Sequence, residues 1–254
     1  MRSEIGIIYS APMVLARKAG RKSQTRRPVR IAKVYEPDFG KPVLDKAWID
    51  TSYLKPACGN VPCLKIPFDG NGQKGMETTQ RHFPKWEPRD LLWTRETHTI
   101  MSWKRLSSKF QSVYRLTGYY TADRQKFQIC LTVAESRKFH RRQRQVGTIP
   151  AIFMYRSLSR FQDVVTKVRV ERVQQITEKD AKAEGVPDRH DVFHPSLQSR
   201  MFNVHTRNYA ALWDSIHGRD AWDRNDWVWI VEFKPAPKRR RPKRWLDRRK
   251  GARR

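Results

Sequence analysis

The chain has 254 residues, and its 53 Lys and Arg against 25 Asp and Glu leave a net charge of +28 at neutral pH. This surplus predicts attraction to a polyanion, because so many like charges repel one another unless a partner offsets them. The nine Trp and eleven Phe favour a packed interior over a disordered chain. No apolar run approaches the roughly 18 residues that a membrane span needs, so we expect nucleic acid rather than a membrane as the partner.

Secretion and metal binding are both disfavoured. Glu4 and Pro12 interrupt the N-terminal apolar stretch, which is atypical of a signal peptide. Three cysteines cannot form a full disulfide framework, which is typical of a reducing cytoplasm. Cys58 and Cys63 lack a convincing second pair of zinc ligands. We therefore expect a cytoplasmic protein with no metal and no other cofactor.

The N-terminal region predicts a strand, a helix and a second strand. Residues 4–10 form a short apolar strand, after which Ser10 caps a helix over residues 12–19. Gly20 follows where a helix end favours a left-handed residue. Residues 25–31 form the next strand, and the proline within it confines that strand to a sheet edge.

The stretch AGRKSQTRRPVR, residues 19–30, contains an ordered motif as well as charge. Its spacing is G-x-K-x-x-T-x-R, formed by Gly20, Lys22, Thr25 and Arg27. The neighbouring cations lower the pKa of Lys22, which favours the neutral amine that a general base needs. Thr25 can act as nucleophile or hydrogen-bond donor if Lys22 lies in the turn, because strand residues three apart face opposite sides.

The middle of the chain is less regular. Residues 35–88 are rich in Pro, Gly, Asp and Lys, and we interpret them as a long irregular insertion. Residues 90–97 predict a strand, and residues 114–123 predict another with a turn at Gly118. Residues 102–145 interleave aromatic side chains with cations. Such a mixture can stack bases and bind phosphates, and it can equally be core packing.

The best-bounded helix follows a half-buried strand at residues 164–176. Thr177 and Asp180 have a capping-box pattern, and Gly185 supplies the end of the helix. Glu184 departs from local preference, because the helix dipole disfavours a carboxylate in the last turn by a few tenths of a kcal/mol. We expect Lys22 to compensate that charge, which marks the pair as a candidate site.

The C-terminal part contains a loop over residues 186–204, a helix over 207–218 and a buried strand over 226–234. From residue 235 onward, eleven cations and one acid leave a charge of +10, with +18 in the preceding residues. We expect this tail to be disordered until it meets an anion. The candidate nucleic-acid contacts are Arg21, Arg26 and Arg27 in the motif and Lys238, Arg239, Arg240, Arg241, Lys243 and Arg244 in the tail.

Four blocks in this order resemble the ASCH domain of the PUA-like superfamily. They are the glycine motif, DLLWTRET, VRVERVQQITEKDAKAEGV, and the pair YAALWDSI and WVWIVEFK. The chain is similar to the longer ASCH proteins of tailed phages, which implies a host-cell cytoplasm. The resemblance implies an α+β fold, a PUA-like small β-barrel with flanking helices, over residues 1–234. Its long loop insertions are expected at about 35–88, 98–149 and 186–204, followed by a basic disordered tail at 235–254.

ASCH proteins are associated with RNA, and one bacterial branch hydrolyses N4-acetylcytidine with a Lys, a Thr and a Glu. Lys22, Thr25 and Glu184 stand at the matching positions. The resemblance therefore implies a metal-independent amidohydrolase that removes an acyl group from N4-modified cytosine, with RNA rather than DNA as partner. Two alternatives stay open: a non-catalytic RNA- or DNA-binding module, and a ribonuclease of the same fold. The insertions and the tail favour a substrate larger and more anionic than a free nucleoside.

Overall fold

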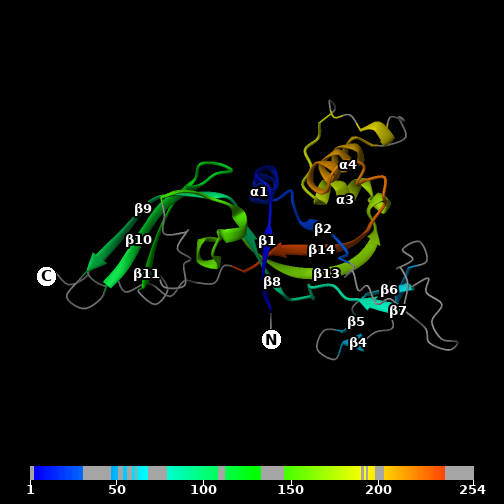
Figure 1. Ribbon diagram of the computed structural model, residues 1–254, viewed down its shortest axis with the longest axis horizontal. Helices are drawn as coiled ribbons and strands as arrows, with labels where there is room; N and C mark the ends of the chain where they lie inside the picture. The colour runs from blue at the N-terminus through cyan, green and yellow to red at the C-terminus, as the bar shows by residue number, and fades with distance from the viewer. Residues whose placement is uncertain are drawn as a thin grey trace, which may run out of the picture.

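The computed structural model describes residues 3–30, 47–50, 54–55, 59–60, 62–67, 79–107, 112–132, 146–189, 192, 194–197 and 203–237 (Figure 1). Over these ranges the chain has an α+β fold in which strands predominate, as the sequence predicted. The basic tail from residue 238 and most of the first insertion lie outside the described residues.

A five-stranded sheet carries the site. Its order is β1-β8-β13-β14-β2, with bounds Glu4–Ile8, Leu91–Arg95, Gln162–Arg172, Trp227–Pro235 and Gln24–Pro28. β1 and β8 are parallel, and every other neighbouring pair is antiparallel. All five strands were predicted. The interior strand β14, between β13 and β2, is apolar on both faces because Trp229 and Val231 pack into one core cluster while Val228 and Ile230 pack into another.

This sheet does not close into the barrel that we expected. β1 and β2 are its two edges, and no backbone pairing joins them among the described residues. A side chain crosses the gap instead: Arg27 Nη2 donates to the carbonyl oxygen of Ile8 at 2.7 Å. The space between β1 and β2 is therefore lined by side chains, which leaves room for cavities along it.

Within the described ranges, three α-helices flank the sheet: α1 (Ala11–Lys18), α3 (Glu178–Ala183) and α4 (Val204–His217). Short 3-10 turns occur at Ala151–Phe153, Arg156–Leu158, Val173–Gln175 and Pro195–Leu197. A buried ion pair between Arg17 and Asp163 of β13 holds α1 on the sheet, with Nε to Oδ2 at 2.9 Å. α4 begins earlier than predicted because the Asn203 side chain caps it. No helix in the described ranges is long and apolar enough to cross a bilayer.

A second sheet has the order β11-β10-β9-β12, with bounds Lys126–Thr132, Ser112–Tyr120, His98–Ser107 and Gly147–Ile149. The predicted turn at Gly118 is wrong, because β10 continues through Gly118 with a shift of register. A Cβ at this position would lie 2.2 Å from the carbonyl oxygen of Thr99 and 2.7 Å from the Phe127 ring. The glycine therefore permits a close strand approach rather than a chain reversal.

The aromatic side chains of this sheet support the packing interpretation of residues 102–145. Tyr120 is buried in a third core cluster with Ile100 and Leu116, and Phe127 packs against it. The Tyr120 and Phe127 ring centroids lie 4.9 Å apart. These rings are core residues of the second sheet rather than an exposed platform for bases.

The first insertion contains more regular structure than we expected. A three-stranded sheet has the order β3-β6-β7, with bounds Trp48–Asp50, Cys63–Pro67 and Thr79–His82. β4 (Leu54–Lys55) and β5 (Gly59–Asn60) form a short ladder. Leu64 and Ile66 of β6 are fully buried and join the core cluster of the main sheet. The alternation of apolar residues in CLKIP is too short to predict this strand against the surrounding Pro and Gly.

Candidate functional site

A cavity of about 390 Å³ lies where β1 ends, beside β2 and the ends of α3 and α4. Its lining includes Tyr9, Lys22, Thr25, Glu184, Tyr209 and Trp213. The catalytic candidates Lys22, Thr25 and Glu184 thus line one cavity, although Glu184 lies far from the other two in the chain. Its volume is within the range of about 300–1,000 Å³ typical of small-molecule sites.

The turn before β2 presents Lys22 to this cavity. Gly20 adopts the left-handed conformation with φ of +75°, and the Arg21 and Lys22 amides both donate to the Ala16 carbonyl oxygen, at 3.0 and 3.3 Å. Lys22 therefore lies in the turn, and Thr25 lies in β2. Sequence analysis required Lys22 to lie in the turn if Lys22 and Thr25 were to share a site, and the structure has this arrangement.

Glu184 reaches the cavity because α3 ends directly beside this turn. The helix begins as predicted, because the Thr177 hydroxyl oxygen accepts a hydrogen bond from the Asp180 amide at 3.1 Å. It ends at Ala183, with Glu184 as its C-cap and Gly185 following at a φ of +84°. The Ser23 amide donates to the Ala183 carbonyl oxygen at 2.9 Å. Two segments distant in the sequence are thus joined through their backbones at the point where both side chains enter the cavity.

Gly185→Ala is expected to destabilise the fold more than Gly20→Ala. Both glycines have positive φ, which costs an L-residue about 1–2 kcal/mol. A Cβ at Gly185 would also lie 2.7 Å from the Ala16 Cβ and 3.0 Å from the Lys22 Cβ, whereas a Cβ at Gly20 meets nothing within 4 Å. Overpacking adds about 1–3 kcal/mol. Urea denaturation of the two variants measures the difference, and equal losses would show that the crowding is relieved at no cost.

The amine of Lys22 is bound tightly to Glu184. Nζ lies 3.0 Å from Glu184 Oε2 and 2.8 Å from the Glu184 carbonyl oxygen. Lys22 and Glu184 are each 4% exposed, so this pair is shielded from water and its charges interact more strongly than on a surface. The contact also compensates the carboxylate at the end of α3, as the sequence predicted.

Burial lowers the pKa of the Lys22 amine, because the desolvated ammonium is disfavoured. Glu184 opposes this shift, and the cations Arg27 and Arg26 add to it. The sequence attributed the shift to neighbouring cations alone, whereas desolvation is its largest cause. Two nearby cations of α1 have their own acids: Arg17 pairs with Asp163, and Lys18 Nζ lies 2.6 Å from Asp123 Oδ2.

Arg26 is in a different environment from the nucleic-acid contact that we predicted. Its side chain is fully buried, and its guanidinium lies 3.2 Å from Asp180 and 3.5 Å from Glu184. A third carboxylate, that of Glu171, is 3.7 Å away. The charge of Arg26 is thus used within the protein, where it contacts Glu184 Oε1 while Lys22 contacts Oε2. Charge content alone could not separate this buried arginine from exposed ones.

The other predicted cations fall into two groups. Arg21 is exposed and donates to the Gly185 carbonyl oxygen at 3.4 Å, and Arg27 is half-buried beside the cavity. The tail residues Lys238, Arg239, Arg240, Arg241, Lys243 and Arg244 lie outside the described residues. Among the predicted contacts in the described residues, Arg27 therefore lines the cavity, and Arg21 is exposed on the turn next to it.

Sequence reasoning missed two residues with unmet hydrogen-bonding atoms. Tyr9 and Trp213 line the cavity, and the Tyr9 hydroxyl and Trp213 Nε1 are buried without a partner in the described part of the chain. Burial raises the pKa of Tyr9, so its hydroxyl remains a donor at neutral pH. Buried polar atoms are normally paired, which points to a polar ligand. Tyr9 and Trp213 have apolar neighbours in the sequence, which is the pattern of core residues and gives no sign of a binding site.

The described residues contain no cluster of three or more His, Cys, Asp or Glu side chains with metal-ligand geometry. Cys63 is buried in β6, and Cys58 lies outside the described residues. The residues that line the cavity instead carry an amine, a carboxylate, hydroxyls, guanidinium groups, an imidazole and an indole nitrogen. This set suits acid–base and hydrogen-bonding chemistry.

Comparison with known proteins identifies no relative. No family model matches the sequence, and neither a curated protein nor a solved structure shows significant similarity to it.

Proposed function

We propose that the cavity around Lys22 hydrolyses the amide of an N4-acylated cytosine. The observation that carries this proposal is the buried contact between Lys22 Nζ and Glu184 Oε2, at 3.0 Å, in a cavity that Thr25 also lines. A base, a proton carrier and a hydroxyl are the groups that metal-independent amide hydrolysis uses. The similarity of the glycine motif to ASCH domains suggests the acylated cytosine as substrate.

In the proposed reaction, one proton moves from the nucleophile through Lys22 and Glu184 to the leaving nitrogen. Neutral Lys22 removes a proton from water or from the Thr25 hydroxyl, and the resulting oxygen nucleophile attacks the amide carbonyl carbon. Lys22 passes the proton to Glu184 across their contact. Glu184 then protonates the cytosine N4 as the carbon–nitrogen bond breaks. If Thr25 is the nucleophile, a water repeats the attack on its ester and frees the carboxylic acid.

The remaining polar atoms of the cavity suit recognition of a base. Cytosine has acceptors at O2 and N3, and the Tyr9 hydroxyl and Trp213 Nε1 are donors with no partner among the described residues. Tyr209 and Trp213 also supply aromatic surface. Buried donors with no partner within the described part of the protein favour a ligand that pairs with them.

The fold itself is proposed to be a PUA-like one whose sheet is left open. The support is the succession of elements: the motif follows β1 and α1, and β13, α3, α4 and β14 follow in the order of the matching sequence blocks. The opening between β1 and β2 is where the cavity lies. Fold and reaction are separate proposals, since one fold serves many activities.

The direct test incubates the purified protein with N4-acetylcytidine, both as nucleoside and within an RNA oligonucleotide, and detects cytidine by mass. Formation of cytidine that requires Lys22 supports the proposal. Tight binding of the oligonucleotide without turnover of any acylated cytosine would support the binding module instead.

The pH profile of this hydrolysis has an expected sign. The reaction needs neutral Lys22, so kcat/KM rises with pH through the pKa of its amine. That midpoint lies below the ordinary lysine value of 10.5 because burial lowers it. Arg27 also lowers it, so Arg27→Gln is expected to move the midpoint to higher pH. A midpoint that moves to lower pH in Arg27→Gln would contradict the assignment of the rising limb to Lys22.

A further inference from the structure

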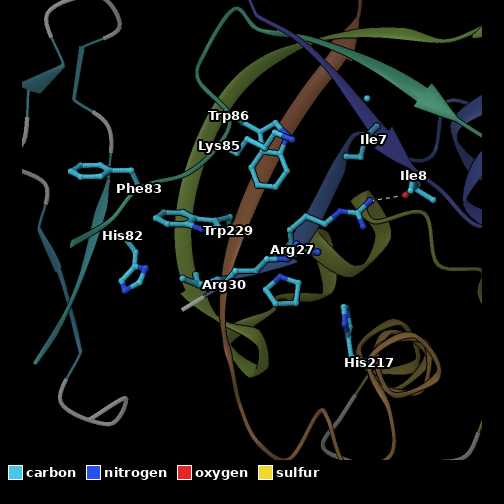
Figure 2. Close-up of a pocket in the computed structure, with 13 residues that line it drawn as sticks. Ile7, Ile8, Arg27, Arg30, His82, Phe83, Lys85, Trp86, His217 and Trp229 are labelled. Atoms are coloured by element: carbon cyan, nitrogen blue, oxygen red, sulfur yellow. Dashed lines mark hydrogen bonds between the residues drawn. The ribbon is translucent and has the colours of Figure 1, made fainter. Parts of the chain in front are cut away.

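A second cavity, of about 630 Å³, lies along the same opening between β1 and β2 (Figure 2). It shares Ile8, Arg27 and His217 with the cavity around Lys22. The hydrogen bond from Arg27 Nη2 to the Ile8 carbonyl oxygen, drawn as a dashed line in Figure 2, lies at this common boundary. The two cavities are therefore neighbours, and a ligand longer than the first can extend past Arg27 into the second.

The second cavity is positively charged. Arg27, Arg30 and Lys85 line it, and no Asp or Glu is among the described residues that do so. Arg30 and Lys85 are exposed, and neither has a carboxylate partner in the described part of the chain. Unpaired cations in a cavity concentrate field and attract anions. The charge of this surface therefore favours a ligand with phosphate groups.

Aromatic rings share the cavity with these cations. Phe83 and Trp86 come from the segment after β7, and Figure 2 shows Trp229 of β14 in the same cavity. His82 is 9% exposed, and its Nε2 is buried without a partner in the described ranges, as is Trp86 Nε1. Rings beside cations are the combination that binds single-stranded nucleic acid, where bases stack and phosphates pair.

We infer that this second cavity, the flanking groove, binds the single strand that adjoins the reacting base. The inference rests on the proposed function, and it names the substrate as a modified cytosine within a polynucleotide rather than a free nucleoside. Arg30 and Lys85 contact phosphates, and Phe83 stacks on a neighbouring base. A duplex does not fit this path, because a base must leave its stack to enter the cavity around Lys22.

The test compares three variants of the full chain: Arg30→Ala/Lys85→Ala, Phe83→Ala, and a control, Lys167→Ala/Lys179→Ala. The control removes the same charge from exposed lysines that line neither cavity. The ligand is a short RNA with N4-acetylcytidine at its centre, and its affinity is measured by fluorescence anisotropy at several salt concentrations. Hydrolysis of the free nucleoside is measured in parallel, because it reports whether the fold and the first cavity are intact.

Arg30→Ala/Lys85→Ala is expected to lower the slope of log affinity against log salt by about 1.4, at about 0.7 for each single-strand phosphate contact. Phe83→Ala is expected to weaken binding about tenfold, since loss of one stacked base costs about 1–3 kcal/mol. The control keeps the wild-type slope, and all three variants keep wild-type turnover of the nucleoside. The same losses are expected with single-stranded DNA, because phosphates and base faces are common to both.

Wild-type affinity in both groove variants would overturn the inference, even if the nucleoside is hydrolysed. A loss seen only with duplex RNA, or an equal loss in the control, would overturn it as well. If no acylated cytosine is hydrolysed but the groove variants lose affinity as expected, the groove stands and the proposed reaction fails. The two proposals therefore fail in different measurements.

Discussion

Replacement of Lys22 by arginine is expected to abolish hydrolysis of acylated cytosine while the protein stays folded. An arginine keeps the positive charge beside Glu184, but its guanidinium does not lose a proton at any accessible pH. General-base catalysis contributes about 10²–10⁴-fold, so kcat/KM should fall at least a hundredfold. The measurement is kcat/KM by product mass, with the melting temperature as the readout of folding.

Lys18→Arg is the matched control for this variant. Lys18 lies four residues earlier on α1, half-exposed, with its amine paired to Asp123 rather than facing the cavity. It should retain wild-type kcat/KM. Thr25→Ser should keep activity and Thr25→Ala should lose it, because only the hydroxyl takes part. Activity near wild type in Lys22→Arg would show that the charge of Lys22, and not its proton transfer, is what the site uses.

Removal of the basic tail is expected to weaken nucleic-acid binding without any effect on hydrolysis of the free nucleoside. The chain should end after residue 237 rather than earlier, because β14 runs to Pro235 and the Ala236 amide donates to the Gln162 carbonyl oxygen at 2.9 Å. All eleven cations of the tail follow that point. If six of them contact phosphates, the slope of log affinity against log salt falls by about 4 to 5.

The control for this truncation is the full chain titrated with the same oligonucleotide at the same salt concentrations. An unchanged slope would mean that the phosphates lie elsewhere, on the +18 carried by residues 1–234. The flanking groove would then be the first surface to examine. A fall in nucleoside turnover would instead show that the tail contributes to the fold or to the cavity around Lys22.

Most of the main sheet could be predicted from local patterns. The alternating residues of β13, the continuous apolar run of β14 and the capped helix α3 each show their structure within one short window. The meeting of Lys22 and Glu184 was predicted for a different reason. The helix dipole disfavours the negative charge of Glu184, and the neighbouring cations disfavour the positive charge of Lys22. A contact between the two side chains offsets both effects.

The features that sequence did not reveal depend on contacts between distant segments. In the sequence Arg26 looks no different from its cationic neighbours. In the structure, strand alternation points its side chain toward the carboxylates of Asp180 and Glu184. Gly118 reads as a turn because glycine usually marks one, and only the nearness of the Thr99 carbonyl oxygen reveals the bulge. The flanking groove joins Arg30 to Lys85 across an insertion that showed no periodicity, so its cations could not be grouped in advance.

Amide hydrolysis at the cavity around Lys22 is tested most directly by tracing the oxygen atom that water contributes. Wild-type protein is incubated with an RNA oligonucleotide containing N4-acetylcytidine in water enriched in oxygen-18, and the products are analysed by mass. We expect labelled acetate and an unlabelled cytidine that retains its N4 amine within an intact strand, whereas Lys22→Arg should form neither product and leave the acetylated strand unchanged. Labelled uridine, a cleaved strand or unchanged substrate would contradict amide hydrolysis by Lys22, Thr25 and Glu184.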